Sequence, residues 1–394
     1  MYTSMFRKAM LGDTALLALD FSAGSLPTAV TFTRADTTAR ATFIDASGYV
    51  KTVTAAGDPR FDYTGGVAKG LLVEAAATNL LKSSAYADTN FWLTAGGYSK
   101  SYTTGITSPA NDTSAVRLTF SSTGHGLYTN NTLMGYTNTV GDTYTWSAWI
   151  RSTSGSSNIR FGDSAVALGA NIPITTTWTR YSYSYTAVAN SGPYLGSASG
   201  TATGEFEMWG FQLEKATSLS SYINTTTASL TRLADDAVIR STAWTSLYAQ
   251  PGAMVVEFYR GAYGTGDRSI MSTDTTAARH WHLKNANASA TAQIAYSTSP
   301  ATTQTGLTAG LNKVAIAWNA PSPTASFDLC VNGATPTFGG SNVGTTLSTW
   351  LTLGSQSTTG VSGTGVWDGY LNNSIKSVKY YTGLTYAEMQ AKTT

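Results

Sequence analysis

Cysteine, histidine and charged residues are all scarce in this chain of 394 residues. Its single cysteine, Cys330, excludes an intrachain disulfide, and the alternating stretch around it predicts a buried strand residue rather than a reactive thiol. Only 12% of the residues are charged, and the 24 basic and 22 acidic side chains include no stripe of Lys or Arg. We therefore expect neither nucleic acid nor an anionic membrane as a partner.

Long apolar runs are also missing. No segment approaches the roughly 20 apolar residues that a membrane-spanning helix requires, so we expect no membrane insertion. The basic residues Arg7 and Lys8 before an apolar stretch resemble a signal peptide, but Asp13 interrupts the pattern and the stretch is too short. The sequence therefore predicts a soluble protein without a recognisable targeting segment.

Few residues could serve as general bases or metal ligands. The chain has three histidines, His125, His280 and His282. The last two share one face of a predicted strand, but no third ligand stands at a suitable spacing. The loops at Gly162-Asp163 and Asn111-Asp112 leave a structural calcium ion open, although neither has the regular Asp spacing of a known calcium loop. Otherwise we expect no metal and no cofactor.

Carboxylate pairs offer little more for catalysis. A glycosidase needs two carboxyl groups about 5 to 10 Å apart, and Glu205 with Glu207 is the best pair in the sequence. Both lie on one face of a predicted strand whose other face carries Phe206, Met208 and Gly210. Such a pattern is more typical of solvated strand glutamates, and we expect the protein not to be an enzyme.

Threonine, serine and glycine are abundant, and they punctuate short segments in which apolar and polar residues alternate. A strand about every ten residues, with Gly, Asn and Ser turns between, predicts an all-β protein of two β-sandwich (jelly-roll) domains after a small β-rich N-terminal segment. The clearest predicted strands are residues 116–120, 143–151, 179–185, 204–213, 254–259, 278–283, 313–318, 326–331 and 374–381.

Composition and spacing suggest four segments. Residues 1–81 form a β-rich attachment segment with too little apolar mass to fold alone, so it should pack against a sandwich or against neighbouring copies. Residues 82–225 form the first sandwich, 226–245 a threonine-rich linker, and 246–394 the second sandwich.

Two local signals define shorter elements. Ala46-Ser47-Gly48 separates two short alternating runs and predicts a β-hairpin in which Gly48 supplies a positive φ. Thr385 precedes a short helical pattern over 386–392 and predicts its N-cap.

Aromatic residues are plentiful, with 10 Trp, 22 Tyr and 13 Phe. Rings on an exposed sheet face can stack on sugars, so we searched the strands for outward rings. Trp146 and Trp149 are three apart and must face opposite ways, and Trp149 shares its face with Arg151, which predicts that Trp149 is the outward ring. Tyr181 and Tyr183 share one strand face that is either core or concave surface. These four residues, Trp149, Arg151, Tyr181 and Tyr183, are the candidate ligand-binding residues.

Three groups of motifs stand out along the chain. The first group comprises Phe32-Thr33-Arg34-Ala35, the hairpin 43–50, Pro59-Arg60-Phe61-Asp62-Tyr63, Gly70-Leu71-Leu72-Val73-Glu74 and Thr78-Asn79-Leu80-Leu81. The second comprises Phe211-Gln212-Leu213-Glu214, Ser221-Tyr222-Ile223 and Thr231-Arg232-Leu233-Ala234-Asp235. The third comprises Gly369-Tyr370-Leu371, Val378-Lys379-Tyr380-Tyr381 and residues 384–389. Together they resemble tailed-bacteriophage virion proteins. The first group resembles the opening of that family, the second the end of its carbohydrate-binding-module-like jelly roll, and the third the close of its concanavalin-like, laminin-G-like lectin domain.

The resemblance implies a virion structural protein, such as a tail fibre, baseplate or head-fibre appendage, located on the phage particle. Its implied partners are other virion proteins and a host cell-surface glycan, and its implied assembly is a homotrimer. One departure is that Ala75-Ala76-Ala77 stands where the family often has a charged residue. Two alternatives remain: a capsid decoration or assembly protein with no ligand, and a polysaccharide depolymerase.

Overall fold

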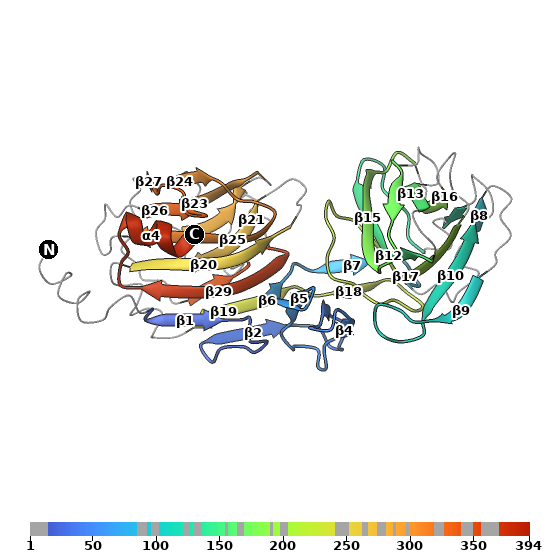
Figure 1. The fold of residues 1–394 in the computed structure, drawn as a ribbon, viewed down its shortest axis with the longest axis horizontal. Coiled ribbons are helices and arrows are strands. Elements are labelled where there is room, and N and C mark those ends of the chain that lie inside the picture. The colour runs from blue at the N-terminus through green and yellow to red at the C-terminus, as the bar shows by residue number, and fades with distance from the viewer. Residues whose placement is uncertain are drawn as a thin grey trace, which may run out of the picture. The chain divides into compact units, whose positions relative to one another are not determined.

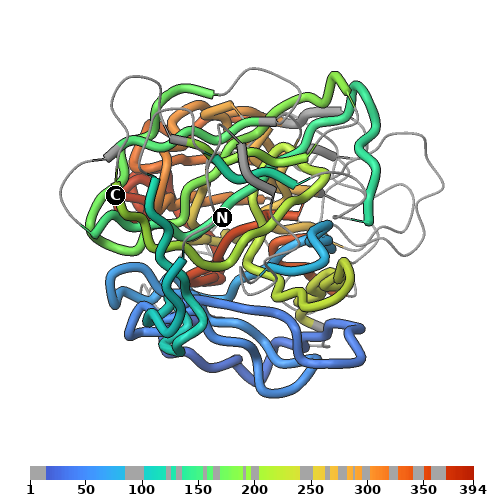
Figure 2. The backbone as a smooth tube through the Cα atoms, turned by 90° about the vertical axis from the view of Figure 1, so that its right-hand side faces the viewer, coloured from blue at the N-terminus to red at the C-terminus, as the bar shows by residue number. Residues whose placement is uncertain are grey.

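The computed structural model describes most of the chain, and the remaining residues are grey in the backbone trace of Figure 2. The described residues are 15–84, 93–95, 102–120, 126–129, 135–153, 157–163, 169–189, 192–197, 204–240, 252–261, 267–273, 281–286, 289–296, 299–318, 327–339, 350–355 and 370–394.

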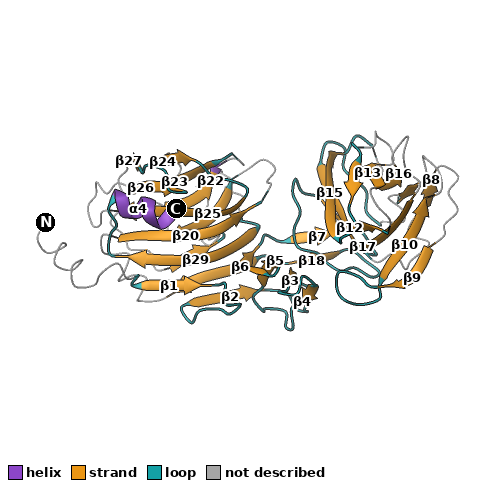
Figure 3. Ribbon diagram, viewed as in Figure 1, coloured by secondary structure: helices purple, strands orange, loops and turns teal. Residues whose placement is uncertain are grey.

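The predicted all-β fold is confirmed, because antiparallel sheets account for nearly all regular structure in the described residues (Figure 3). The chain divides into two compact units. Unit 1 comprises Met1–Thr37, Thr54–Ala75 and Ala234–Thr394, and unit 2 comprises Thr38–Val53 and Ala76–Leu233.

Unit 1 contains two large sheets (Figure 1). The eight-stranded sheet has the order β27-β26-β25-β20-β29-β6-β5, with β1 also paired to β29. Its strands are β1 (Leu17–Asp20), β5 (Phe61–Thr64), β6 (Val67–Val73), β20 (Gly252–Arg260), β25 (Gly310–Trp318), β26 (Phe327–Val331), β27 (Thr337–Gly339) and β29 (Asn373–Tyr381). The seven-stranded sheet runs, in order, β2 (Val30–Arg34), β19 (Asp235–Arg240), β28 (Trp350–Leu353), β21 (Arg268–Thr273), β22 (Trp281–Asn285), β23 (Thr291–Tyr296) and β24 (Ser299–Thr305).

Apolar side chains from both sheets of unit 1 form one core. Met254 and Ile375 of the eight-stranded sheet are buried in the same cluster as Ile270 and Leu351 of the seven-stranded sheet. Burial of such side chains, each worth about 1.5 to 3 kcal/mol, makes this unit a sandwich.

Unit 2 is a smaller sandwich. We call one of its sheets the front sheet, in the order β15 (Thr179–Thr186), β12 (Thr143–Ser152), β17 (Gly204–Glu214), β10 (Ala115–Phe120) and β9 (Tyr102–Ile106). We call the other the back sheet, in the order β14 (Ile172–Ile174), β13 (Ser157–Asp163), β16 (Pro193–Ser197), β11 (Gly126–Tyr128) and β8 (Leu93–Ala95). Two small sheets complete the unit: β3 (Thr42–Ile44) with β4 (Val50–Thr52), and β7 (Ala77–Asn79) with β18 (Leu230–Arg232).

The inner faces of the front and back sheets pack together. Trp146 of β12 is fully buried, and its ring centroid lies 4.2 Å from that of Phe161 on β13. Leu127 and Leu195 of the back sheet belong to the same cluster. The alternation of each strand therefore assigns its remaining residues to an outer face.

The N-terminal residues are divided between the two units instead of forming a separate segment. β1 and β6 pair with β29, and β2 pairs with β19, which places these strands in unit 1. β7 pairs with β18, which places it in unit 2. As expected, the weak N-terminal core is completed by later strands. The predicted linker at 226–245 itself contributes β18 and β19.

The two short local elements are confirmed. Asp45 Oδ1 accepts hydrogen bonds from the amides of Ser47 and Tyr49, and Gly48 has a φ of +84° in the β3–β4 hairpin. Helix α4 (Tyr386–Thr393) begins at the N-cap Thr385, which forms a capping box with Glu388. Within the described residues, no helix is long and apolar enough to cross a membrane.

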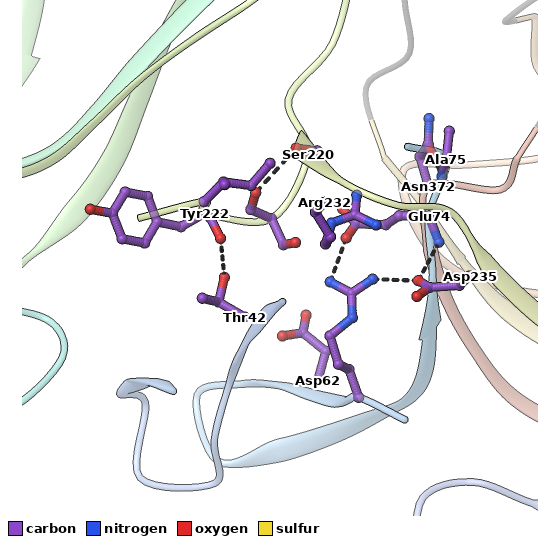
Figure 4. A network of polar contacts seen from close by, with 12 residues as sticks. Thr42, Asp62, Glu74, Ala75, Ser220, Tyr222, Arg232, Asp235 and Asn372 are labelled. Atoms are coloured by element: carbon purple, nitrogen blue, oxygen red, sulfur yellow. Dashed lines mark hydrogen bonds and ion pairs between the residues drawn. The ribbon is translucent and has the colours of Figure 1, made fainter. Parts of the chain in front are cut away.

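A buried ion network joins four strand ends of unit 1. Asp235 Oδ1 accepts a hydrogen bond from Arg34 at 3.0 Å, and Asp235 Oδ2 accepts one from Arg60 and one from the amide of Glu74. Arg60 also donates to Glu74 Oε2 at 2.6 Å, and Arg34 to Asp36 at 2.9 Å. Figure 4 shows Glu74 and Asp235 meeting at this network. Arg34, Arg60, Glu74 and Asp235 all come from the motifs that carry the bacteriophage resemblance.

Candidate functional site

The outer face of the front sheet gathers the polar and aromatic residues of three neighbouring strands. Glu207 of the central strand β17 lies opposite Arg117 of β10 and opposite Arg151 of β12. One step along the sheet, Trp209 lies opposite Trp149, which in turn lies opposite Arg180 of β15. The register therefore produces a charged row beside an aromatic row.

Strand β17 contains a β-bulge at Gly210, which interrupts its alternation of inward and outward residues. Ser147 pairs with Gln212 but Trp149 pairs with Trp209, so β17 has one extra residue here. Gly210 has a φ of +67°, a conformation that L side chains rarely adopt. The prediction that Gly210 continues the apolar face of Phe206 and Met208 was wrong at this position.

The aromatic row is covered by other parts of unit 2. Trp149, Trp209, Tyr222 and Val50 belong to one buried cluster, in which the rings of Trp209 and Tyr222 lie 4.7 Å apart. Trp149 is only 8% exposed, and the guanidinium of Arg180 lies 4.5 Å from its ring centroid. Trp149 points away from the main core as predicted, but the prediction of an exposed ring was wrong, because Trp149 is buried in this cluster, with the Tyr222 ring centroid 5.5 Å from its own.

The charged row stays accessible. Arg117, Glu207 and Arg151, which we call the arginine–glutamate row, form two ion pairs: Arg117 Nη2 lies 2.6 Å from Glu207 Oε1, and Arg151 Nε lies 2.5 Å from Oε2. The two arginine side chains are 35% and 32% exposed, whereas Glu207 is 3% exposed. Among the described residues, the Nη atoms of Arg151 have no hydrogen-bond partner and remain able to donate.

The electrostatics of the row hold Glu207 as an anion. Burial would raise the pKa of Glu207, but the hydrogen bonds and charges of Arg117 and Arg151 outweigh it and lower the pKa. A glycosidase acid instead needs a raised pKa, so that the group keeps its proton near neutral pH. Glu207 therefore suits the acceptance of hydrogen bonds better than the donation of a proton.

Two neighbours extend the row. Trp178 is partly exposed, and the guanidinium of Arg151 lies 4.8 Å from its ring centroid. On the other side, Glu205 accepts a hydrogen bond from Thr153 Oγ1 at 3.2 Å. The row with these neighbours presents arginine donors, the partly exposed carboxylate of Glu205 and an indole ring on one sheet face, which are the groups that bind sugar hydroxyls and sugar C–H faces.

Tyr181 and Tyr183 lie on the opposite side of the front sheet. Tyr183 pairs with Trp146 and Tyr181 with Ala148, and all four share the inner face. Both tyrosines are partly buried against the main core, and Tyr181 accepts a hydrogen bond from the amide of Thr175. Core was one of the two interpretations left open for this face. The four candidate residues therefore do not converge on one site.

Sequence reasoning missed Arg117 and Trp178. Arg117 alternates outward in β10, but only the antiparallel register with β17 shows that it meets Glu207. Trp178 lies in the short connection before β15, where no periodic pattern assigns a face. Outward arginines on neighbouring predicted strands are the one signal that could have identified the row.

The other candidate ligands do not assemble into a metal site. Within the described ranges, no group of three or more His, Cys, Asp or Glu side chains could hold a metal ion. Asp112 Oδ1 accepts hydrogen bonds from Ser108 and Ser114 instead. His282 is buried in β22, whereas His125, His280 and the side chain of Asp163 lie outside the described residues. Cys330 is buried as predicted.

Comparison with known proteins finds no family and only low similarity to solved structures. No protein family matches the sequence, and no curated protein matches it. The sialidase CBM40 of Ruminococcus gnavus, solved with α2,3-sialyllactose, is 20% identical, and the match covers 38% of this chain and 86% of that one with a TM-score of 0.27. The CBM22-1 xylan-binding domain of Paenibacillus barcinonensis Xyn10C is 14% identical over 35% of this chain and 91% of that one, with a TM-score of 0.26. At these identities and TM-scores the matches assign no role to this chain, and the bacteriophage resemblance stays a prediction.

Proposed function

We propose that the protein is a non-enzymatic structural component of a bacteriophage particle, a tail or head appendage of the fibre or baseplate type. In this proposal the outer face of the front sheet contributes to adsorption by binding a host-surface glycan. The arginine–glutamate row carries the glycan part of the proposal, because it keeps two arginines accessible on the sheet face beside Trp178, with the buried Glu207 holding both in place.

The buried ion network supports the structural part. Arg34, Arg60, Glu74 and Asp235 come from motifs far apart in the sequence, yet they form one set of ion pairs. Because these residues pair with one another, the occurrence of the separate motifs in one chain has a structural explanation. Mass spectrometry of purified phage particles from the source of this sequence should detect the chain, and a complete inventory that lacks it would contradict the virion role.

Substitutions in the row test glycan binding. Loss of a hydrogen bond to a charged group costs about 1.5 to 3 kcal/mol, so Arg151→Ala and Glu207→Gln should each weaken binding on a glycan array about 10- to 100-fold. Lys215→Ala is the matched control, because Lys215 is 53% exposed and pairs with Asp142 away from the row. Equal binding by all three variants would contradict the assignment of this face.

A capsid decoration or assembly protein without a ligand is the second candidate function. The observation that favours it is the burial of Trp149 and Trp209 in a cluster with Tyr222, which removes both indole rings of this face from solvent. If the wild-type protein binds no glycan but is present in particles, this alternative replaces the first proposal. For a polysaccharide depolymerase, the lowered pKa of Glu207 argues against this carboxyl as the general acid.

We also propose that the protein is a homotrimer, as the resemblance implies. Closed symmetry would cover exposed strand edges equally in every copy. Light scattering should then return three times the 41.4 kDa chain mass, and a stable monomer at micromolar concentration would contradict the trimer.

A further inference from the structure

On the outer face of the back sheet, two glycines lie next to two tyrosines on the neighbouring strands β11 and β16. Leu127 of β11 and Leu195 of β16 are fully buried in the main core, so their strand neighbours point outward. These outward neighbours are two glycines and two tyrosines: Gly126 lies opposite Gly196, and Tyr128 lies opposite Tyr194.

The tyrosine ring of Tyr194 lies over the glycine pair. A Cβ atom at Gly126 would stand 2.3 Å from the Tyr194 hydroxyl oxygen, and one at Gly196 would stand 2.3 Å from Tyr194 Cε1. Both separations are far below van der Waals contact, so the ring occupies the space where two side chains would otherwise be. One face of the ring is therefore against the backbone, and Tyr194 remains partly exposed.

The neighbouring strand adds a polar side chain to this face. Arg160 of β13 lies opposite Gly196, and its Nε donates to Asn171 Oδ1 at 2.6 Å. Burial raises the pKa of Tyr194, so its hydroxyl stays protonated and can donate as well as accept. A ring laid on the sheet, with its own hydroxyl and with an arginine on the neighbouring strand of the same face, is the pattern of a sugar-stacking platform.

We infer that Tyr194, laid flat on Gly126 and Gly196, is a second glycan contact of unit 2, on the back sheet. Its occupant is a pyranose of glucose-like stereochemistry, whose axial hydrogens form a flat apolar face that stacks on the ring. This inference rests on the proposed glycan-binding function but assigns a different face from the arginine–glutamate row.

Cellohexaose, a chain of β-linked glucose, is the probe. Saturation-transfer NMR and calorimetric titration should show binding to the wild-type protein, and Tyr194→Ala should weaken it about 2- to 10-fold. Tyr194→Phe keeps the ring and should retain most of the binding. Gly196→Ala forces the ring off the sheet and should weaken binding even if Tyr194→Ala folds poorly. Tyr102→Ala, at a 36% exposed tyrosine of β9, is the matched control and should bind as wild type.

The outcomes separate the two sites. Weakening by Tyr194→Ala and Gly196→Ala, with Tyr102→Ala unchanged, supports the platform. Unchanged binding by Tyr194→Ala, together with loss in Arg151→Ala, overturns the platform and leaves the proposed front-sheet function standing. Loss in Tyr194→Ala with no effect of Arg151→Ala supports the platform and contradicts the front-sheet assignment. No binding of cellohexaose to the wild-type protein overturns the platform, and the glycan array then decides the proposed function on its own.

Discussion

Asp235 is the residue on which the ion network of unit 1 depends. Its two carboxylate oxygens accept hydrogen bonds from Arg34, from Arg60 and from the amide of Glu74, and it is fully buried. Buried charges are stabilised only while each has its partner, because removal from water costs several kcal/mol per ion. A neutral residue at this position would leave two buried guanidinium groups short of an anion.

We therefore predict that Asp235→Asn lowers the free energy of unfolding by about 3 to 5 kcal/mol, the usual cost of breaking a buried pair. Chemical denaturation followed by circular dichroism would measure the change. Asp62→Asn is the control, because Asp62 pairs with Lys69 at 3.2 Å near the surface and should cost at most about 1 kcal/mol. Similar losses of unfolding free energy in both variants would contradict a larger stabilising contribution from Asp235.

The lowered pKa of Glu207 leads to a second prediction about a single residue. Its folded pKa lies below the ordinary 4.5, so its contribution to stability is complete above that pH and is lost as the pH falls through the folded pKa. The stability difference between wild type and Glu207→Gln should stay constant at neutral pH and shrink on acidification. A difference that grows as the pH falls would contradict the ion-pair assignment.

At the scale of elements, the bulge in β17 is the feature most sensitive to sequence. Gly210 combines a positive φ with a close neighbour, since a Cβ there would stand 2.8 Å from Trp149 Cε3. Gly210→Ala should lower the free energy of unfolding by about 2 to 4 kcal/mol, from backbone strain plus overpacking. Gly105→Ala is the matched control, because Gly105 has a φ of +77° with open space around it and should show the strain alone. Equal losses would mean that the contact with Trp149 costs nothing.

Elements with local causes were predictable from sequence. Alternation located strands such as β12 and β20, and the signals at Gly48 and Thr385 located a hairpin and a helix, because each depends on residues a few positions apart. The burial of Trp149 was not predictable, since Val50, a member of the same buried cluster, lies 99 positions before it in the sequence. For the same reason Arg151 could be predicted as a candidate residue from the sequence, whereas its position beside Glu207, which also binds Arg117, depends on the strand register.

At the scale of the whole molecule, strand pairing rather than chain order decides the division into units. The chain passes between the units at residues 37/38, 53/54, 75/76 and 233/234. Composition suggested consecutive segments, because it cannot show that β1 and β6 pair with β29 some 300 residues later. Unit 1 is therefore built from both ends of the chain.

This division predicts the behaviour of a nicked protein. Cleavage within 226–245 should give two fragments that stay together on native size exclusion, because β1, β2 and β6 remain paired with strands of the other fragment. They should separate only in denaturant. Two fragments that elute apart without denaturant would show that the strand pairing between the ends of the chain does not hold unit 1 together.

The central claim is that this all-β chain binds a bacterial surface glycan without cleaving it. The most direct test incubates the purified protein with capsule or lipopolysaccharide polysaccharide from candidate hosts, and measures both retention of the polymer and release of reducing ends. The account predicts that at least one polymer is retained, that its length is unchanged, and that Arg151→Ala retains less of it. Release of reducing ends that disappears in Glu205→Gln or Glu207→Gln, or no retention of any polymer, would contradict it.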